Sequence, residues 1–308
     1  MYRRLPHVVV LVCLISTLPL SAGNGGHYTV PRTEHGHPDF QGNWATSFLT
    51  PLERPDGVAS LVVTPHQAQI LVAALRARMP AVIDPDVQLH DIQQLAMVKG
   101  EYRTSVIVDP KDGRLPFTQK GLELAAQVEE RNKTYDDPEQ RPLAERCLEN
   151  LGYAPMRALR VTLPRQIVQT RDSVVISSED SAGVRVIHLG GQTPPPDAVR
   201  SIGGYSVGRW ENDTLVVETT NMRADDPARN VAGRPLLLSR RAKVTERFTR
   251  VSPMELFYRY TVQDDELYTR PWSGEFSMTR FDQPIYEYAC HEGNYSLPNI
   301  LSGGRAQF

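Results

Sequence analysis

The sequence contains little cysteine and carries almost no net charge, and both shortages restrict what the protein does. Only 3 of its 308 residues are cysteines, and its formal net charge at pH 7 is −2. A charge this small lacks the basic footprint of a nucleic-acid-binding protein. After residue 20 no apolar run reaches the roughly 20 residues that a membrane helix needs. We therefore expect neither a nucleic-acid partner nor a membrane span.

The beginning of the sequence matches a secretory signal peptide. Arg3 and Arg4 precede an apolar run over residues 8–20, and residues 21–23 are small enough for cleavage. We expect residues 1–23 to be a signal peptide and the protein to be periplasmic or secreted. Residues 24–38 are polar and are predicted to form a mobile arm. Its histidines are irregularly spaced and lack a nearby carboxylate pair, so we expect a tether and no metal site.

Two cysteines, Cys147 and Cys290, follow the expected leader. In an oxidising compartment an isolated pair is most simply a disulfide. The alternative is a reactive thiol at Cys290 beside His291. The residues leave both possibilities open, although a Cys-His pair with no second cysteine nearby is a poor zinc signature.

Residues 39–155 are predicted to hold a first strand followed by a helical and irregular elaboration. Gly42-Asn43-Trp44 resembles the opening of lipocalin-type barrels, in which the tryptophan closes the barrel floor. Thr64-Pro65 indicates a helix start, because Thr64 suits the N-cap and proline suits the first turn. The spacing that follows predicts an apolar face formed by Ile70, Ala73, Ala74 and Ala77. Thr118 is expected to cap a second helix.

From residue 156 to 308 the pattern changes to alternating apolar and polar residues. Short strands are predicted at residues 166–169, 173–177, 184–188, 206–210, 214–219, 244–251, 256–263 and 268–279. In the strand at 256–263, alternation places Leu256, Tyr258, Tyr260 and Val262 on one face. Successive strands joined by tight turns predict a mainly β fold, an antiparallel meander forming a lipocalin-like barrel or sandwich.

Four segments carry a resemblance to a known family. Residues 208–221, 245–250, 269–272 and 286–294, the last reading Tyr-Glu-Tyr-Ala-Cys-His-Glu-Gly-Asn, are similar to a family of exported, mostly uncharacterised bacterial proteins. The resemblance covers about half of the mature chain and implies export and a β-rich body. It also implies that Cys147, in its Glu-Arg-Cys context, pairs with Cys290 of the C-terminal motif.

The C-terminal motif supplies the best acid-base candidates, His291 and Glu292. Histidine titrates near neutrality and serves as a base or an acid after a small pKa shift. Neighbouring residues on a strand point to opposite sides, so the two share a site only if Gly293 turns the chain. The structural alternative is that His291 caps a carbonyl beside the disulfide while Glu292 pairs with an arginine.

Substrate-binding candidates accompany this pair. Strand arginines that face a cavity can hold a carboxylate or an oxyanion, whereas outward ones pair with Glu211, Glu246 or Asp264. Aromatic side chains can line an apolar pocket or belong to the core. His188 is a weaker candidate. The predicted binding residues are Arg209, Trp210, Arg247, Arg270, Trp272, Tyr286, Tyr288 and Asn294.

Three functional hypotheses follow. The first is a cofactor-independent lyase or isomerase that acts on a small apolar or aromatic metabolite, with His291 moving the proton and Glu292 assisting. The second is a non-catalytic carrier of a hydrophobic small molecule. The third is an envelope scaffold whose motif locks the last strand through Cys147 and Cys290. The sequence leaves the ligand and the oligomeric state open.

Overall fold

A computed structural model gives the fold, and it describes residues 28–78, 92, 94–148, 150, 152–158, 162–179, 183–223, 228–231 and 234–306. The expected signal peptide, residues 1–23, and the first part of the expected arm, residues 24–27, lie outside the described residues.

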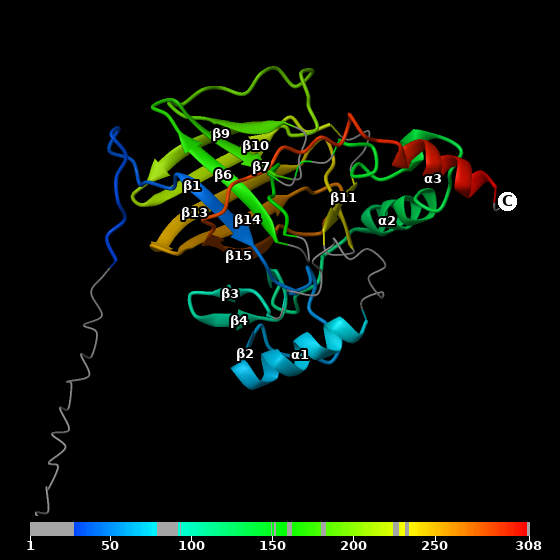
Figure 1. Ribbon diagram of the computed structural model, residues 1–308, viewed down its shortest axis with the longest axis horizontal. Helices are drawn as coiled ribbons and strands as arrows, with labels where there is room; N and C mark the ends of the chain where they lie inside the picture. Colours follow the sequence, from blue (N-terminus) through cyan, green and yellow to red (C-terminus); the bar gives the residue numbers. More distant parts are fainter. Residues whose placement is uncertain are drawn as a thin grey trace, which may run out of the picture.

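In the described part of the chain, nine strands close into a barrel in the order β1-β6-β7-β8-β9-β10-β13-β14-β15, and β15 pairs back with β1 (Figure 1). This confirms the predicted mainly β fold. The barrel strands are β1 (Gly42–Thr46), β6 (Leu163–Gln169), β7 (Ser173–Ser178), β8 (Val184–His188), β9 (Tyr205–Glu211), β10 (Thr214–Thr220), β13 (Lys243–Ser252), β14 (Glu255–Gln263) and β15 (Trp272–Arg280). Strand β5 (Ile107–Asp109) pairs with Ser273 and Gly274 of β15, along the edge of β15 that pairs with β1 further on.

One pairing departs from the predicted antiparallel meander. Strands β8 and β9 are parallel, with Ile187 opposite Ser206 and His188 opposite Val207. A parallel pair cannot be joined by a hairpin and needs a crossover. The loop over residues 189–204 makes that crossover, and the barrel is therefore mixed.

Large side chains fill much of the barrel interior. The alternation predicted for β14 is confirmed, because Leu256, Tyr258, Tyr260 and Val262 are all at most 2% exposed. Tyr258 packs against Phe248 and Phe276, with ring centroids 4.9 Å apart in both pairs. The inward alternate positions thus form one aromatic core.

Two short helices come from the region predicted to be helical. Helix α1 (Pro65–Ala77) begins at Thr64, whose side chain accepts the Gln67 amide in a capping box. Helix α2 (Gln119–Arg131) begins at Thr118, which accepts the amide of Gly121. Both predicted N-caps are confirmed.

The predicted apolar face of α1 is wrong. Ile70 is 56% exposed, and the buried residues are Ala68, Val72 and Leu75. These three pack with Leu49 and Leu95 in a small second core. Which face of α1 is buried depends on the residues it packs against, here Leu49 and Leu95 outside the barrel. Helical spacing alone does not identify that packing partner.

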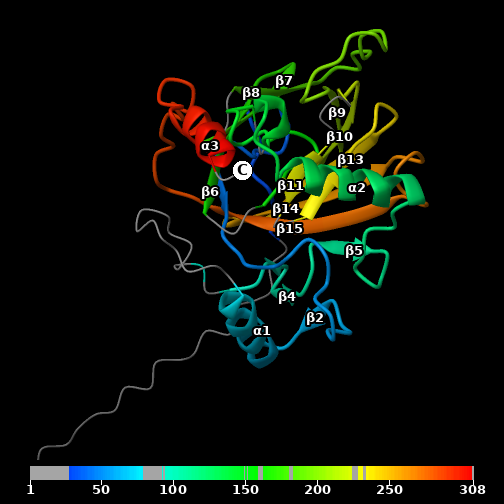
Figure 2. The same cartoon turned by 90° about the vertical axis from the view of Figure 1, so that its right-hand side faces the viewer.

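The remaining elements surround the barrel (Figures 1 and 2). A three-stranded sheet lies beside α1 and on the outer side of β15. Helices α2 and α3 lie at one end of the barrel. These elements are β2 (Val62–Val63), β3 (Met97–Val98), β4 (Glu101–Arg103), the 3-10 helix η1 (Pro138–Gln140), the hairpin β11 (Ala228–Val231) and β12 (Arg234–Leu237), and α3 (Ser296–Arg305).

Residues 28–38, the described part of the expected arm, lie against the opposite end of the barrel (Figure 1). Arg32 forms an ion pair with Asp213 at the β9–β10 turn, and the His37 ring stacks on Trp210 with centroids 5.2 Å apart. Val30 is buried.

Candidate functional site

The C-terminal motif lies outside the barrel, between β15 and α3. Cys290 forms a disulfide with Cys147, and their Cα atoms are 5.7 Å apart. This confirms the disulfide and excludes a free thiol at Cys290 in this structure. The bridge fastens the motif to the segment that follows α2.

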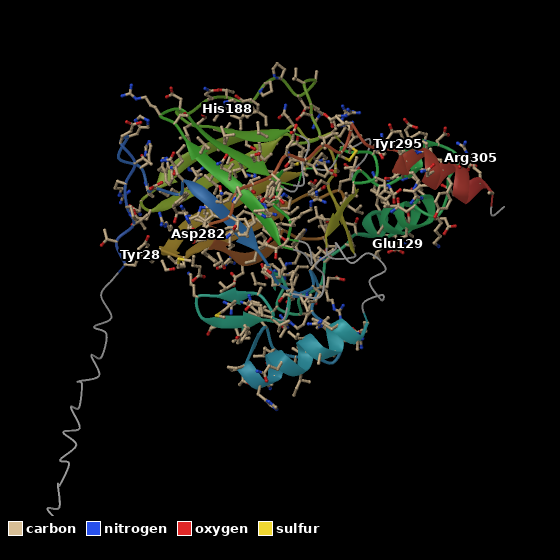
Figure 3. The ribbon with its side chains drawn as sticks, viewed as in Figure 1. Tyr28, Glu129, His188, Asp282, Tyr295 and Arg305 are labelled. Atoms are coloured by element: carbon tan, nitrogen blue, oxygen red, sulfur yellow. A yellow bond between two sulfur atoms is a disulfide. The ribbon has the colours of Figure 1, made fainter. Side chains whose placement is uncertain are left out.

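His291 and Glu292 are both exposed in the turn that carries the disulfide. Tyr286 is 71% exposed and Tyr288 is 39% exposed, so neither lines an enclosed pocket. Figure 3 shows Tyr295, at the start of α3, on the outside of the molecule. The chain thus presents the predicted catalytic pair to solvent.

Asn294 forms side-chain hydrogen bonds on both sides of the disulfide turn. Its side-chain amide donates to the carbonyl of Glu145 at 3.1 Å and to Sγ of Cys147 at 3.3 Å. Its side-chain oxygen accepts the amide of Leu297 in the first turn of α3. Asn294 therefore links the disulfide to the beginning of the helix.

The three candidate arginines all lie on the outer surface and pair with carboxylates. Arg209 contacts Glu211 and Glu218, and Arg247 contacts Glu211. The hydrogen bond from Arg247, helped by Arg209, lowers the pKa of Glu211. Arg270 pairs with Asp109. These groups form surface ion pairs and do not line the barrel interior.

The two candidate tryptophans lie at different depths. Trp272 is 0% exposed and belongs to the barrel core, where it meets Tyr260 and Tyr268 edge-on. Trp210 is partly buried beneath the His37 ring. His188, at the end of β8, stacks on Tyr205 with centroids 4.7 Å apart. Figure 3 shows His188 away from Tyr295, the residue that follows the C-terminal motif.

A buried polar cluster inside the barrel was not predicted. The side chains of Arg185 and Glu246 are 2% and 0% exposed and form an ion pair. Tyr258 donates its hydroxyl to Glu246 at 2.7 Å. Burial, together with the Glu246 carboxylate, raises the pKa of Tyr258 well above its usual value, so Tyr258 stays a donor.

Every N–H of the Arg185 guanidinium has an acceptor. Nε donates to Ser206 at 3.2 Å, and Nη1 donates to Glu246 at 2.9 Å and to the carbonyl of Gly152 at 3.1 Å. Nη2 donates to Thr219 at 3.0 Å and to the second Glu246 oxygen. Arginine has five N–H donors, so the Arg185 guanidinium is fully satisfied.

Residues 152–158, which we call the strap, cover this cluster. Besides the Gly152 carbonyl, the Met156 amide donates to the Tyr258 hydroxyl oxygen at 2.7 Å. The carbonyl of Arg157 accepts from Arg165 on β6. Ala154 and Met156 are 0% and 2% exposed. The strap is thus joined to three barrel side chains.

The sequence contained the signal for this cluster. In β8, alternation places Arg185 on the same face as the buried Ile187, and in β13 it places Glu246 between Val244 and Phe248. The expectation of Glu246 as a solvated surface partner is wrong, because the residue faces inward. Asp264, also expected at the surface, is buried and accepts from Ser239.

Residues 204–208 read Gly-Tyr-Ser-Val-Gly, which matches the spelling of a hydrolase nucleophile turn. That chemistry requires the serine on a sharp turn between a strand and a helix. Ser206 instead lies within β9, is buried, and hydrogen-bonds Thr219 at 2.9 Å. Its hydroxyl belongs to the polar cluster.

A cleft of about 380 Å³ lies on the barrel wall where β1 meets β15 and where the segment before β3 approaches. Its apolar lining includes Phe48, Met97 and Phe281, and its polar lining includes Glu255 and Thr279. Glu255 accepts the amide of Lys99 and the hydroxyl of Ser277. No residue of the 286–294 motif lines this cleft.

These features define a disulfide-linked, mixed β-barrel with a buried ion pair and a cleft on its wall. Among the described residues, no helix has both the length and the apolar character to cross a membrane. The same residues contain no group of three or more histidine, cysteine or acidic side chains placed to hold a metal ion.

The chain matches no protein-family model and no curated protein sequence. Among solved structures it is similar to a secretary abundant heat soluble (SAHS) protein from Ramazzottius varieornatus. The two share 10% sequence identity, the match covers 51% of this chain and 85% of that chain, and the TM-score is 0.20. The fold assignment above depends on the strand pairing alone.

Proposed function

We propose that the protein is an exported carrier that binds a small, partly apolar molecule in the cleft between β1, β15 and the segment before β3. The observation behind this proposal is the cleft itself, whose volume of about 380 Å³ falls in the range of small-molecule sites. Such sites combine an apolar lining with a few polar groups that orient the ligand.

The lining suits an amphipathic ligand with a flat or branched apolar part. Phe48 and Phe281 contribute aromatic rings to the lining, and Ala45 contributes a small side chain from β1. Glu255 and Gln94 supply the polar groups, and Glu255 is already held by Lys99 and Ser277. A held carboxylate is a good acceptor for a ligand hydroxyl or amine, because it loses little side-chain entropy on binding.

Export is part of the same proposal. The first 23 residues have the composition of a signal peptide, and a disulfide persists in oxidising compartments. The periplasm or the extracellular space is therefore the expected location.

The lyase or isomerase hypothesis stays a prediction. It needs His291 and a bound ligand to share one site, since proton transfer requires heavy atoms within roughly 3 Å. His291 is exposed in the disulfide turn, and the cleft is lined by other residues. The carrier function needs no group from the 286–294 motif, so it requires fewer assumptions than the enzyme hypothesis.

Native mass spectrometry of the mature protein, purified from its own compartment, tests the carrier proposal. We expect a retained small molecule in the wild type and its loss in Thr279→Trp, because Thr279 is an exposed residue that lines the cleft. The matched control is Val184→Trp, which adds the same ring to the outer face of β8, where Val184 is 52% exposed.

Two results would contradict the proposal. Equal ligand retention by Thr279→Trp and Val184→Trp would exclude the cleft as the binding site. The second result is that the wild-type protein converts the purified ligand when it is returned, and that His291→Ala abolishes this conversion. That result would favour the enzyme hypothesis over the carrier.

A further inference from the structure

A second recess lies at the end of β10, on a part of the surface that shares no lining residue with the cleft. It is open, with a volume of about 700 Å³. Its lining is dominated by three arginines and includes Asp197, Arg200, Thr220, Asn221, Arg240 and Arg241.

The crossover loop between β8 and β9 forms one wall of the recess. Asn221, immediately after β10, holds this loop through its side-chain amide, which donates to the carbonyls of Pro195, Pro196 and Val199. The backbone of Asn221 has φ of 57°, a left-handed conformation that asparagine tolerates better than most residues. The loop, and Arg200 with it, is therefore fixed in place.

Arg200 is nearly buried and only partly satisfied. Its side chain is 7% exposed. Nη1 donates to the carbonyls of Met222 at 3.1 Å and Arg240 at 2.9 Å, and Nη2 donates to the Asp197 carboxylate. Nε is buried and has no hydrogen-bond partner. An unpaired buried donor is costly, and an incoming acceptor would relieve that cost.

The other two arginines add positive charge at the rim. Arg240 is exposed, and among the described residues its guanidinium makes no hydrogen bond or ion pair. Arg241 pairs with Asp265 at 2.7 Å, but both side chains are largely exposed, so this pair is weak. The lining of the recess thus contains three arginines and one acidic residue, Asp197.

We propose that this recess binds a small oxyanion carrying two or more negative charges, either a phosphate monoester or a polycarboxylate. Planar guanidinium groups bind both kinds of oxyanion through paired N–H···O bonds. The recess is distinct from the carrier cleft, so the proposal does not depend on the proposed function.

Asp197 acts as the internal competitor of the ligand. Its side chain is 87% exposed and reaches back to Nη2 of Arg200. The hydrogen bond from Arg200 lowers the pKa of Asp197, and the nearby charge of Arg240 contributes further. An oxyanion that enters the recess competes with this carboxylate for Nη2 of Arg200.

Because Asp197 competes with the ligand, removal of this recess residue is expected to strengthen oxyanion binding. Asp197→Asn removes the competing charge and is expected to tighten oxyanion binding roughly threefold, whereas Arg240→Ala removes a free guanidinium and weakens binding roughly fivefold. The matched controls are Asp172→Asn and Arg171→Ala. They change net charge equally at the exposed β6–β7 turn, outside the recess.

We would titrate the folded, full-length mature protein with inorganic phosphate and, separately, with citrate at constant ionic strength. The readouts are the dissociation constant by calorimetry and the Nε–Hε NMR signals of arginine, with the Arg200 signal assigned from Arg200→Lys. Saturable binding of either probe, a shift of the Arg200 signal and the expected order of the variants support the site. The probe that binds more tightly identifies the oxyanion class.

Three outcomes would overturn the proposal. The first is that neither probe binds. The second is that Arg240→Ala and Arg171→Ala have the same effect, and the third is that Asp197→Asn and Asp172→Asn tighten binding equally. The last two would show a response to net charge and not to a site.

Discussion

Replacement of Arg185 by methionine is expected to destabilise the fold severely, because it leaves the Glu246 carboxylate buried without its cation. Glu246 is 0% exposed and would keep only the Tyr258 hydroxyl as a donor. Removal of one partner from a buried ion pair costs about 3–5 kcal/mol. The free energy of unfolding of a domain is roughly 5–15 kcal/mol, so about a fifth or more of the stability is at stake.

The double variant Arg185→Met/Glu246→Leu isolates the pair from its surroundings. Both charges are removed together, and Ser206 and Thr219 keep the hydrogen bond that joins their hydroxyls. Replacement of both members of a buried pair by apolar residues is often neutral or stabilising, by about 1–4 kcal/mol. We therefore expect the double variant to be more stable than either single variant.

Urea denaturation followed by tryptophan fluorescence measures these differences without adding salt that screens charges. An unchanged slope of free energy against urea shows that only stability has changed. The control is Arg209→Met, the same substitution on β9 at a surface arginine that is 55% exposed. Exposed pairs contribute roughly 0–1 kcal/mol, so this variant is expected to resemble the wild type.

The reasoning would be refuted if Arg185→Met cost as little as Arg209→Met. It would also be refuted if the losses of Arg185→Met and Glu246→Leu simply added in the double variant. Additive losses are the behaviour of distant, independent sites, whereas groups in direct contact show coupling.

Two further predictions follow from the covalent link and from the buried phenols. Reduction of the Cys147–Cys290 bridge, which spans 143 residues in sequence, is expected to lower stability by up to about 5 kcal/mol in the chain-entropy model. Cys147→Ser/Cys290→Ser should reproduce the loss, and an unchanged melting temperature in that variant would contradict it. Burial raises the pKa of three tyrosines, Tyr258, Tyr260 and Tyr268, above the unfolded value of about 10. Their contribution to stability is complete below pH 10 and is lost as the pH rises above it. Ultraviolet titration should show these phenols ionising only together with unfolding, and smooth titration of every tyrosine in the folded protein would rule this out.

The strands were predictable because their positions depend on local alternation. In β14 an apolar or aromatic side chain recurs at every second residue, and the structure buries all four of these residues, Leu256, Tyr258, Tyr260 and Val262. The N-caps at Thr64 and Thr118 were equally local, since a cap needs only a side-chain oxygen and the next turn. Strand neighbours were less predictable, as the parallel β8–β9 pair depends on a long crossover loop.

The candidate site was less predictable for a physical reason. A dense group of polar residues at 286–294 attracts a catalytic interpretation, but density along the chain does not determine whether the segment faces a cavity or solvent. Arg185 and Glu246 lie 61 positions apart in sequence and meet only because β8 and β13 close the same barrel. Polar residues at inward positions of a strand pattern were the usable signal, but the sequence interpretation expected Glu246 at the surface and assigned no role to Arg185.

The disulfide and the buried ion pair act on the same stretch of chain. Cys147 precedes the strap, whose Gly152 carbonyl accepts from Arg185 and whose Met156 amide donates to Tyr258. On the far side of the bridge, Asn294 holds the carbonyl of Glu145 and the first turn of α3. The motif therefore holds the chain at Cys147, ahead of the strap, from outside the barrel, while the polar cluster holds the strap itself from inside. Because a buried polar network is stable only when all its members are satisfied, the covalent anchor outside helps to keep the Arg185 donors paired inside.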